Sequence, residues 1–337
     1  EKVLTNQAVK VQMEDTSADF SIEKPFKFSG EKTFKPIDLK KWESISNEVS
    51  SKFSGNDWIY NGDFTIRDEK LTQTFVSTEG SEIQQHRQYI RVILSAKTKA
   101  EDGTSLPIFK TYFAFAPDEL PSKETLLRDT DKLIEKLAEL RDSELMSSYT
   151  GPALLSGEAS GVFFHEIFGH RIEGHREKDP NSSQMFKKSI GEKILPDHID
   201  VIFDPTIKKL DGYSLSGYYE YDDEGVKSQK VITVDDGIFQ GFLMSRSPIE
   251  GFDNSNGHGR KQVGYKAVTR QSNLIVKSEE TEEFDELREM LRDEAEDQGL
   301  EYGLYVDVVQ EGFTLTGRTL PNSFNVHPVI VYKVFVD

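Results

Sequence analysis

The segment His-Glu-Ile-Phe-Gly-His, at residues 165–170, places two imidazoles and a carboxylate within six residues. It follows the apolar run Gly-Val-Phe-Phe at 161–164, which favours a buried helix. Zinc-binding helices of the H-E-x-x-H type carry their histidines four residues apart, on one helical face. Here the spacing is five, and such residues differ by about 140° around a regular helix. The two histidines can therefore meet only if the helix is locally irregular.

A single π-type turn, which widens a helix by one residue, would bring His165 and His170 together. Gly169 lies where such a distortion costs least, because glycine has no Cβ atom. We therefore predict a helix over residues 156–173 with a distortion at Gly169.

The three polar side chains suit a metal centre, because neutral imidazoles are favoured zinc ligands. We predict that His165 and His170 bind zinc and that Glu166 is the general base, which takes a proton from a metal-bound water. The alternative is a buried helix with chance histidines. Buried histidines and a buried glutamate without partners would be costly, which favours the metal.

Further motifs follow this segment in the sequence. They are Asp-Asp-Glu-Gly at 222–225, a predicted strand pair at 231–243, Ser-Asn-Gly-His-Gly-Arg at 255–260 and Arg-Gln-Ser-Asn at 270–273. Together with residues 161–175, and in this order, they resemble the TldD/PmbA family. The resemblance covers about residues 150–337. The H-E-x-x-x-H pattern resembles the TldD branch, which keeps this motif.

The resemblance implies a zinc-dependent metallopeptidase that cleaves unfolded or extended peptides inside an enclosed dimeric chamber. The partner would be a second copy of the chain, giving a homodimer, or a PmbA-like subunit, giving a heterodimer. The resemblance favours a cytoplasmic location. A periplasmic or secreted location is the alternative, if a signal peptide precedes Glu1.

The third zinc ligand is not identifiable from the sequence. The resemblance implies a cysteine near the C-terminus, but the 337 residues contain no cysteine. We therefore expect the C-terminal domain to be incomplete in this sequence. Alternatively, a carboxylate or a third histidine such as His175 completes the site. Glu173 is a candidate ligand, or a carboxylate that accepts a hydrogen bond from a ligating histidine.

Three residues of the glycine-rich loop are candidate substrate-binding groups: Asn256, His258 and Arg260. His258 would hold the substrate backbone or stabilise an oxyanion. The alternative is a tight loop whose glycines serve backbone geometry alone. The acids at 222–224 would bind a substrate amine or a calcium ion, or they are simply solvated.

The formal charge of −18 argues against nucleic acid and anionic membranes as partners, because phosphate binding needs clustered Lys and Arg. It weakly favours cationic or neutral substrates. No apolar run approaches the ~18 residues of a membrane helix, so no membrane association is expected.

The pattern predicts an α+β fold in two domains, residues 1–149 and 150–337. In the first, strands at 63–66, 71–77, 88–94 and 109–115, with turns at Asn61-Gly62, Glu79-Gly80 and Asp102-Gly103, predict an antiparallel sheet. Helices at 37–53 and 121–146 flank it. The second is a mixed α/β-rich domain in which a long sheet carries the motif helix. We expect strands at 198–204, 302–309 and 329–336, and a helix at 279–298.

Two other functions remain open at this stage. A non-catalytic subunit would keep the fold and bind peptides for a TldD/PmbA-type complex, and the absent cysteine motivates this reading. A metal-dependent amidohydrolase would use the same centre on small molecules.

Overall fold

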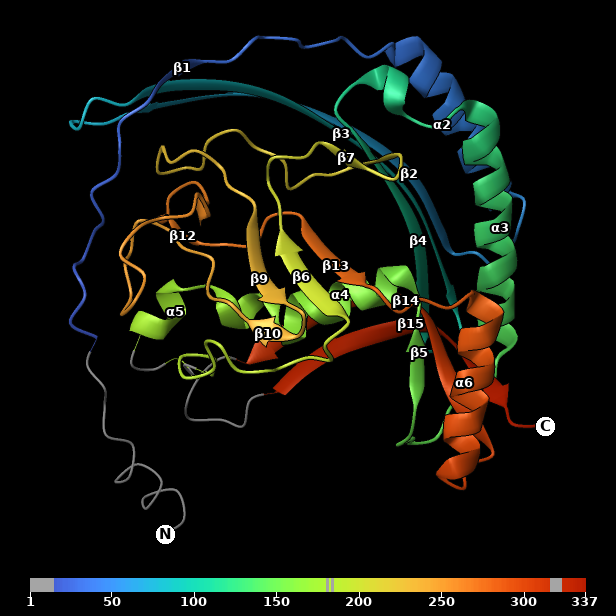
Figure 1. Cartoon of the computed structure of the whole chain (residues 1–337). Helices are drawn as coiled ribbons and strands as arrows, with labels where there is room; N and C mark the ends of the chain where they lie inside the picture. The colour runs from blue at the N-terminus through green and yellow to red at the C-terminus, as the bar shows by residue number, and fades with distance from the viewer. Residues whose placement is uncertain (1–14, 180–181, 183–184, 316–322) are drawn as a thin grey trace.

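A computed structural model describes residues 15–179, 182, 185–315 and 323–337 of the chain. The fold is α+β, as predicted. Figure 1 shows a curved sheet that arches over the rest of the molecule, with two helices packed at one end. The shorter strands, the motif helix and a long C-terminal hairpin lie beneath it.

The curved sheet is a long antiparallel meander. Strand β2 (Asn61–Val76) pairs with β3 (Glu82–Lys99) over its whole length, and β3 pairs in turn with β4 (Ser105–Ala114). Strand β1 (Lys27–Ser29) adds to β3 in parallel. Alternate residues of β3 are buried, as expected for a sheet with one face on the core.

Two details of this sheet were predicted wrongly. Asn61-Gly62 is not a turn but the beginning of β2, and the strands expected on either side of residues 67–70 are one continuous strand. At Gly62 a Cβ atom would lie 2.4 Å from the Phe53 side chain, so glycine is needed there for close helix–sheet packing.

Helices α2 (Leu39–Ser54) and α3 (Lys123–Asp142) cover one face of the sheet. Asp38 and Ser122 cap their N-termini by accepting hydrogen bonds from the backbone N–H groups of Lys41 and Thr125. Their apolar faces join β3 and β4 in a core that includes Trp42, Ile45, Val92, Leu94, Leu126 and Leu137. Ile330, from the C-terminal hairpin, also belongs to this core. The division into two domains stays a prediction.

Two smaller sheets form the rest of the fold. One has the strand order β10-β9-β6-β13, with β6 at Ile199–Phe203, β9 at Val231–Asp235, β10 at Ile238–Phe239 and β13 at Leu274–Ser278. The other has the order β15-β14-β5, with β5 at Ala153–Leu155, β14 at Tyr302–Leu315 and β15 at Ser323–Phe335. Helix α6 (Phe284–Asp297) packs on β14.

The remaining elements are short. They are the 3₁₀ turns η1 (Pro117–Glu119) and η2 (Gly169–Ile172), helix α5 (His175–Lys178), and the strand pairs β7 (Lys209–Leu210) with β8 (Tyr213–Ser214) and β11 (Gly259–Arg260) with β12 (Val268–Thr269). Among the described residues no helix is long and apolar enough to cross a membrane.

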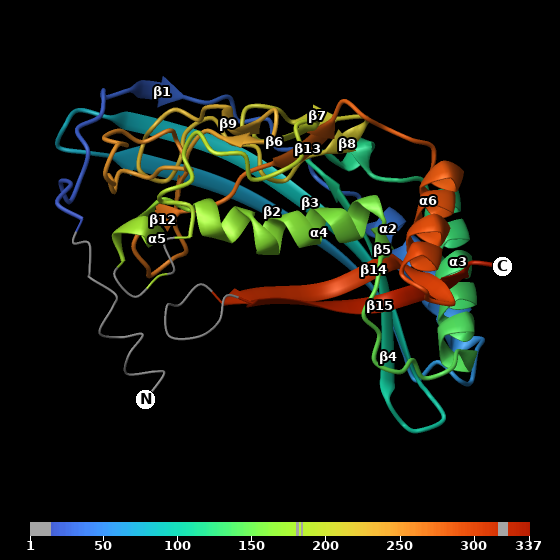
Figure 2. The same ribbon diagram turned by 60° about the horizontal axis from the view of Figure 1, so that its bottom comes forward.

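The motif helix α4 (Gly157–Ile167) lies between the two smaller sheets (Figure 2). On one side Ala159 and Val162 contact apolar residues of β14 and β15. On the other, Phe164 and Ile167 pack against a core that β6, β9 and β10 supply. Contacts on both sides fix the end of α4, where the motif residues lie.

Candidate metal centre

Helix α4 ends within the His-Glu-Ile-Phe-Gly-His motif at residues 165–170. Ser156 caps α4 by accepting a hydrogen bond from the Ala159 N–H. The helix ends at Ile167, and its last α-helical hydrogen bond runs from the Phe168 N–H to the Phe164 carbonyl. Phe168 has φ −115° and ψ −56°, and the chain then tightens into η2. The predicted π-type turn is therefore wrong, as is a continuous helix to residue 173. The irregularity is a change from an α-helix to a 3₁₀ turn.

Gly169 lies against a close neighbour. A Cβ atom there would lie 2.0 Å from the side-chain oxygen of Gln271, whose Nε2 donates a 3.3 Å hydrogen bond to the His165 carbonyl. The approach of Gln271 thus holds the junction between α4 and η2. The predicted place of the distortion is right to within a residue, although its form differs.

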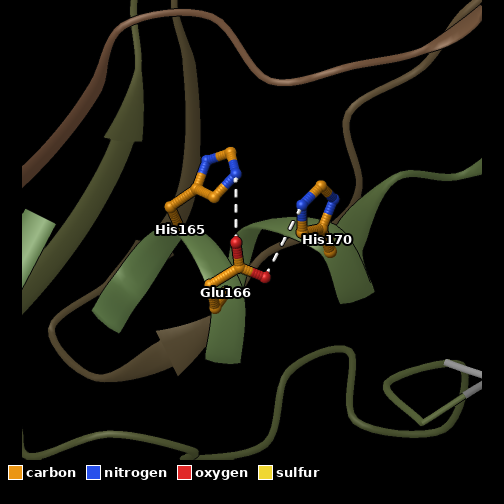
Figure 3. A group of neighbouring side chains, drawn as sticks. All are labelled: His165, Glu166 and His170. Carbon is orange, nitrogen blue, oxygen red and sulfur yellow. Dashed lines mark ion pairs between the residues drawn. The ribbon is translucent and has the colours of Figure 1, made fainter. Parts of the chain in front are cut away.

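The change of helix type brings the two histidines together. The ring centroids of His165 and His170 lie 4.6 Å apart, at 74° to each other. Figure 3 shows the Glu166 carboxylate below both rings, with one oxygen toward each. Its Oε1 lies 3.7 Å from His165 Nε2, and its Oε2 lies 3.8 Å from His170 Nε2. We call these three residues the His-Glu-His cluster.

The donor set fits a zinc ion. One ligand atom from each residue lies within 4.8 Å of the other two, and this is the one such His, Cys, Asp or Glu group among the described residues. Ligands at about 2.1 Å from a tetrahedral metal lie roughly 3.4 Å apart, and the ring nitrogens of the two histidines lie within 4.8 Å of each other. Small side-chain movements would therefore bring them to bonding distance.

Glu166 is buried, with 5% of its surface exposed, and a distant strand orients it. The Thr314 hydroxyl, on β14, lies 2.8 Å from Glu166 Oε2 and 2.5 Å from the Glu166 carbonyl oxygen, and can donate to either. Gly312, on the same strand, leaves room for the carboxylate, because a Cβ atom there would lie 2.8 Å from Glu166 Cγ. Strand β14 thus holds the group that we assigned as general base.

A second carboxylate supports His170 from behind. Glu173 is fully buried, and its Oε1 accepts a 3.2 Å hydrogen bond from His170 Nδ1. Its Oε2 accepts a 2.8 Å bond from Arg176, and Arg270 lies 3.5 Å from Oε1. Burial raises the pKa of Glu173, but His170 and the two arginines outweigh it and hold that pKa below its usual value. An ionised Glu173 leaves His170 Nε2 facing the cluster.

The pKa of His165 is lowered, first by burial and then by His170. Its neutral form, which can bind a metal, is therefore favoured near neutral pH. His175 lies outside the His-Glu-His cluster. It is largely buried, which lowers its pKa to about 4, and its Nδ1 has no hydrogen-bond partner among the described residues. A ligand role for it stays a prediction.

The glycine-rich loop forms a separate polar network. His258 is fully buried, and burial lowers its pKa to about 4. Its Nδ1 lies 3.0 Å from the Asn256 side-chain oxygen, and its Nε2 lies 3.1 Å from the Ser272 hydroxyl. The Asn256 amide in turn bonds the Met244 N–H and the Phe242 carbonyl. These contacts fix the loop, and substrate binding by Asn256 and His258 stays a prediction.

The acids of the predicted Asp-Asp-Glu-Gly loop are not merely solvated. Asp222 is buried and accepts backbone hydrogen bonds from Glu224, Val226 and Gly259, each at 2.9 Å. Asp223 bonds the Lys261 N–H at 2.7 Å and the Arg260 side chain at 3.2 Å. These acids hold the glycine-rich loop in place, a tertiary role that their sequence spacing does not reveal.

Several residues around the cluster carried no individual signal. Thr314 and Gly312 reach Glu166 from almost 150 positions away, so local sequence patterns could not find them. Arg270 and Gln271 lie in the Arg-Gln-Ser-Asn element, which was noted only as part of the resemblance. The structure places that element between the His-Glu-His cluster and the glycine-rich loop, because the Arg270 N–H bonds the His258 carbonyl.

Comparison with known proteins agrees with these motifs. The family model described as PmbA/TldA metallopeptidase C-terminal domain matches residues 148–331. A protein of Methanothermobacter thermautotrophicus, named metalloprotease, is 29% identical over 67% of this chain and 48% of its own. A Buchnera aphidicola protein, named metalloprotease TldD homolog, is 32% identical over 55% of this chain and 38% of its own.

The fold is also that of a solved structure. TldE from Thermococcus kodakarensis aligns with a TM-score of 0.62 at 16% identity, over 94% of this chain and 68% of that one. The chain spans half or less of the length of the curated relatives it matches. Because the family model covers more than half of the chain, including the His-Glu-His cluster, the chain belongs to the PmbA/TldD family.

Proposed function

We propose that this protein is a zinc metallopeptidase whose centre is the His-Glu-His cluster. The observation that carries the proposal is the convergence of two imidazoles and a buried carboxylate within 4.8 Å, at a break between two helix types. Relatives named metalloprotease support a hydrolase that acts with a metal ion.

His165 and His170 would hold the metal, since both present Nε2 toward the same point beside Glu166. When bound, zinc supplies Lewis acidity to a water molecule and to the scissile carbonyl. Glu173 keeps His170 in the tautomer with a free Nε2, because the His170 Nδ1–H donates to its carboxylate.

Glu166 would act as the general base and then as the general acid. Its carboxylate takes the proton of the attacking water and delivers it to the leaving amine. The Thr314 hydroxyl and the close packing of Gly312 restrict the rotation of this side chain, so the carboxylate is held in position for both transfers.

We further propose that the substrates are unfolded or extended peptides and that the working unit is a dimer, of this chain or with a PmbA-like subunit. The family membership and the fold of TldE support this assembly. Mass photometry of the full-length protein, alone and mixed with a PmbA-like subunit from the same organism, tests it. A monomer in both samples would contradict it.

The activity test combines metal content with hydrolysis. Full-length protein is expected to contain about one zinc per chain and to cleave an extended fluorogenic peptide. Chelation should remove both, and added zinc should restore both. A protein that takes up no zinc and cleaves nothing would instead be the non-catalytic subunit. Cleavage of small amides but no peptide would identify the amidohydrolase.

The Glu166→Gln variant separates the two roles available to this residue. If Glu166 is the base, the variant keeps the zinc and loses hydrolysis. If Glu166 is the third ligand, zinc is lost as well, because the cluster then retains two imidazoles. We expect the first result, and loss of zinc from this variant would overturn the assignment.

A further inference from the structure

A cavity of about 740 Å³ opens beside the His-Glu-His cluster. The chain between β11 and β12, together with the residues after β12, forms its wall. Strand β12 lies next to helix α5 in both Figure 1 and Figure 2, on the side of the molecule where α4 ends. Its principal lining residues are Arg260, Lys261, Tyr265, Lys266, Arg270 and Gln271.

The charge of this cavity is opposite to that of the chain. Four of its eight lining residues are Lys or Arg and none is Asp or Glu, although the sequence has 59 acids against 41 bases. We call these residues, Arg260, Lys261, Lys266 and Arg270, the basic pocket. A cluster of one sign in a molecule of the other sign attracts ligands of opposite charge.

Neighbouring acids neutralise only part of the basic pocket. Arg260 pairs with Asp223 at 3.2 Å, and Arg270 lies 3.5 Å from Glu173. Glu173 already serves His170 and Arg176, so it compensates Arg270 incompletely. Within the part of the chain that the structure describes, no ion pair engages Lys261 or Lys266, whose residues are exposed. These two ammonium groups are available to a ligand.

The basic pocket and the metal centre share a wall. Arg270 contacts Glu173, which bonds His170, and Gln271 bonds the His165 carbonyl. A peptide bound at the His-Glu-His cluster would therefore have its neighbouring residues within reach of the basic pocket. A site so close to the reacting bond affects which substrates are bound.

We propose that the basic pocket binds a carboxylate of the peptide substrate, so that the enzyme prefers peptides with an anionic group near the cleaved bond. This rests on the proposed peptidase function and names its substrate class. The carboxylate belongs to an Asp or Glu side chain or to the free C-terminus, and both present the same chemistry to Lys and Arg. This preference is opposite to the cationic or neutral substrates that the net charge favours.

Binding is best measured without turnover, in zinc-loaded full-length Glu166→Gln protein, by fluorescence anisotropy. Three labelled peptides of one length are compared. The first has an internal Glu and an amidated C-terminus, and the second has an internal Gln and a free C-terminus. The third, with an internal Gln and an amidated C-terminus, has neither carboxylate and is the neutral peptide. The double variant Lys261→Glu/Lys266→Glu should lose about tenfold in affinity for whichever anionic peptide binds, and little for the neutral one. The matched control is Lys40→Glu/Lys132→Glu on α2 and α3, which changes the net charge equally.

If the pocket variant loses affinity for the peptide with internal Glu, the basic pocket binds a side-chain carboxylate. If it loses affinity for the peptide with a free C-terminus, the pocket binds the terminal carboxylate. Equal affinity of the pocket variant and the control for every anionic peptide overturns the proposal, as does an equal loss for the neutral peptide. Hydrolysis of all three peptides by protein with Glu166 intact is measured alongside. Cleavage of none of them counts against the peptidase function, whereas a charge-selective loss of binding still supports the basic pocket.

Discussion

The His-Glu-His cluster and the network around Asp222 and His258 are both polar groups in the interior, and both come from sequence motifs. In the network, backbone N–H groups and neighbouring side chains satisfy the carboxylate and both nitrogens of the imidazole. In the cluster, Nε2 of His165 and of His170 lie nearly 4 Å from a carboxylate oxygen, beyond hydrogen-bonding distance. The polar atoms of the network therefore have hydrogen-bond partners, whereas the two Nε2 atoms of the cluster are available to bind a metal.

This difference assigns separate tasks to the two regions. A satisfied buried network stabilises the fold and fixes a loop, so its loss should appear in the free energy of unfolding. Metal-binding atoms that face one another without hydrogen bonds cost stability unless a metal ion binds to them. Loss of the cluster should therefore appear in metal content and catalysis. Each substitution below tests whether the two tasks are in fact separate.

The largest effect is expected for His170→Ala. It removes one of the two imidazoles, so zinc binding and peptide hydrolysis should both fall, the latter by about 10³-fold or more. The free energy of unfolding of the metal-free protein should fall by about 1 kcal/mol, because buried Glu173 loses one donor but keeps Arg176 and Arg270. Zinc analysis, peptide kinetics and urea unfolding measure the three quantities. Full activity in this variant would remove the cluster from the mechanism.

Asp222→Ala should have the opposite effect, lowering stability while leaving zinc binding unchanged. It leaves three buried backbone N–H groups without an acceptor, so the free energy of unfolding should fall by about 3 kcal/mol or more. Zinc binding per folded chain should persist. Asp222→Asn is the control, since its remaining oxygen still accepts from Glu224 and Val226, and it should lose less. Unchanged stability in the alanine variant would mean that the loop does not depend on this carboxylate.

His258→Gln tests the network through pH. Burial lowers the pKa of His258 to about 4, from a usual value of 6.5. Between these pH values the unfolded chain binds a proton that the folded chain does not, so folded-state stability falls as the pH drops. The difference in unfolding free energy between wild type and variant should therefore shrink by about 3 kcal/mol from pH 6.5 to 4.

The comparison with the variant isolates His258 from Asp222, which titrates over an overlapping range. Burial raises the pKa of Asp222 to about 7, so its contribution to stability falls as the pH rises, which is the opposite sign. Both proteins contain Asp222, and its effect cancels in the difference. Urea unfolding at several pH values measures it, and a difference independent of pH would show that His258 is not buried in its neutral form.

The sequence predicted those parts of the fold that depend on local pattern. Apolar spacing located α2 and α3, and alternation located the curved sheet. It failed where a distant residue decides the local geometry. Gly62 was read as a turn because Phe53, which occupies the space of its missing Cβ atom, is recognisable only after folding. At the break, Gln271 contacts Gly169 and donates a hydrogen bond to the His165 carbonyl, and local sequence patterns do not reveal this contact.

The residues of the candidate site likewise divide into those that the sequence identified and those that only the folded structure reveals. His165, Glu166 and His170 are close in sequence, so their chemistry, together with the resemblance that the downstream motifs carry, selected them as a group. The groups that orient them, Thr314 and Arg270, reach the cluster through tertiary packing alone. The acids at 222–224 could not be distinguished from a solvated loop, because burial and backbone partners define their role.

The smallest effect is expected for substitution of Glu173, the residue beside the cluster whose surroundings most resemble those of the network. Glu173 is buried and fully bonded, as Asp222 is, yet one of its partners is the candidate ligand His170. Glu173→Gln keeps the shape but removes the charge, so His170 is oriented less firmly and zinc affinity should fall by about tenfold. Competition with a chelator measures this affinity.

Arg176→Gln is the control, since it removes a partner of Glu173 and leaves the carboxylate on His170. A loss of stability without any change in zinc affinity would place Glu173 with the structural network, whereas a change in zinc affinity at constant stability would make it a positioning residue of the metal centre.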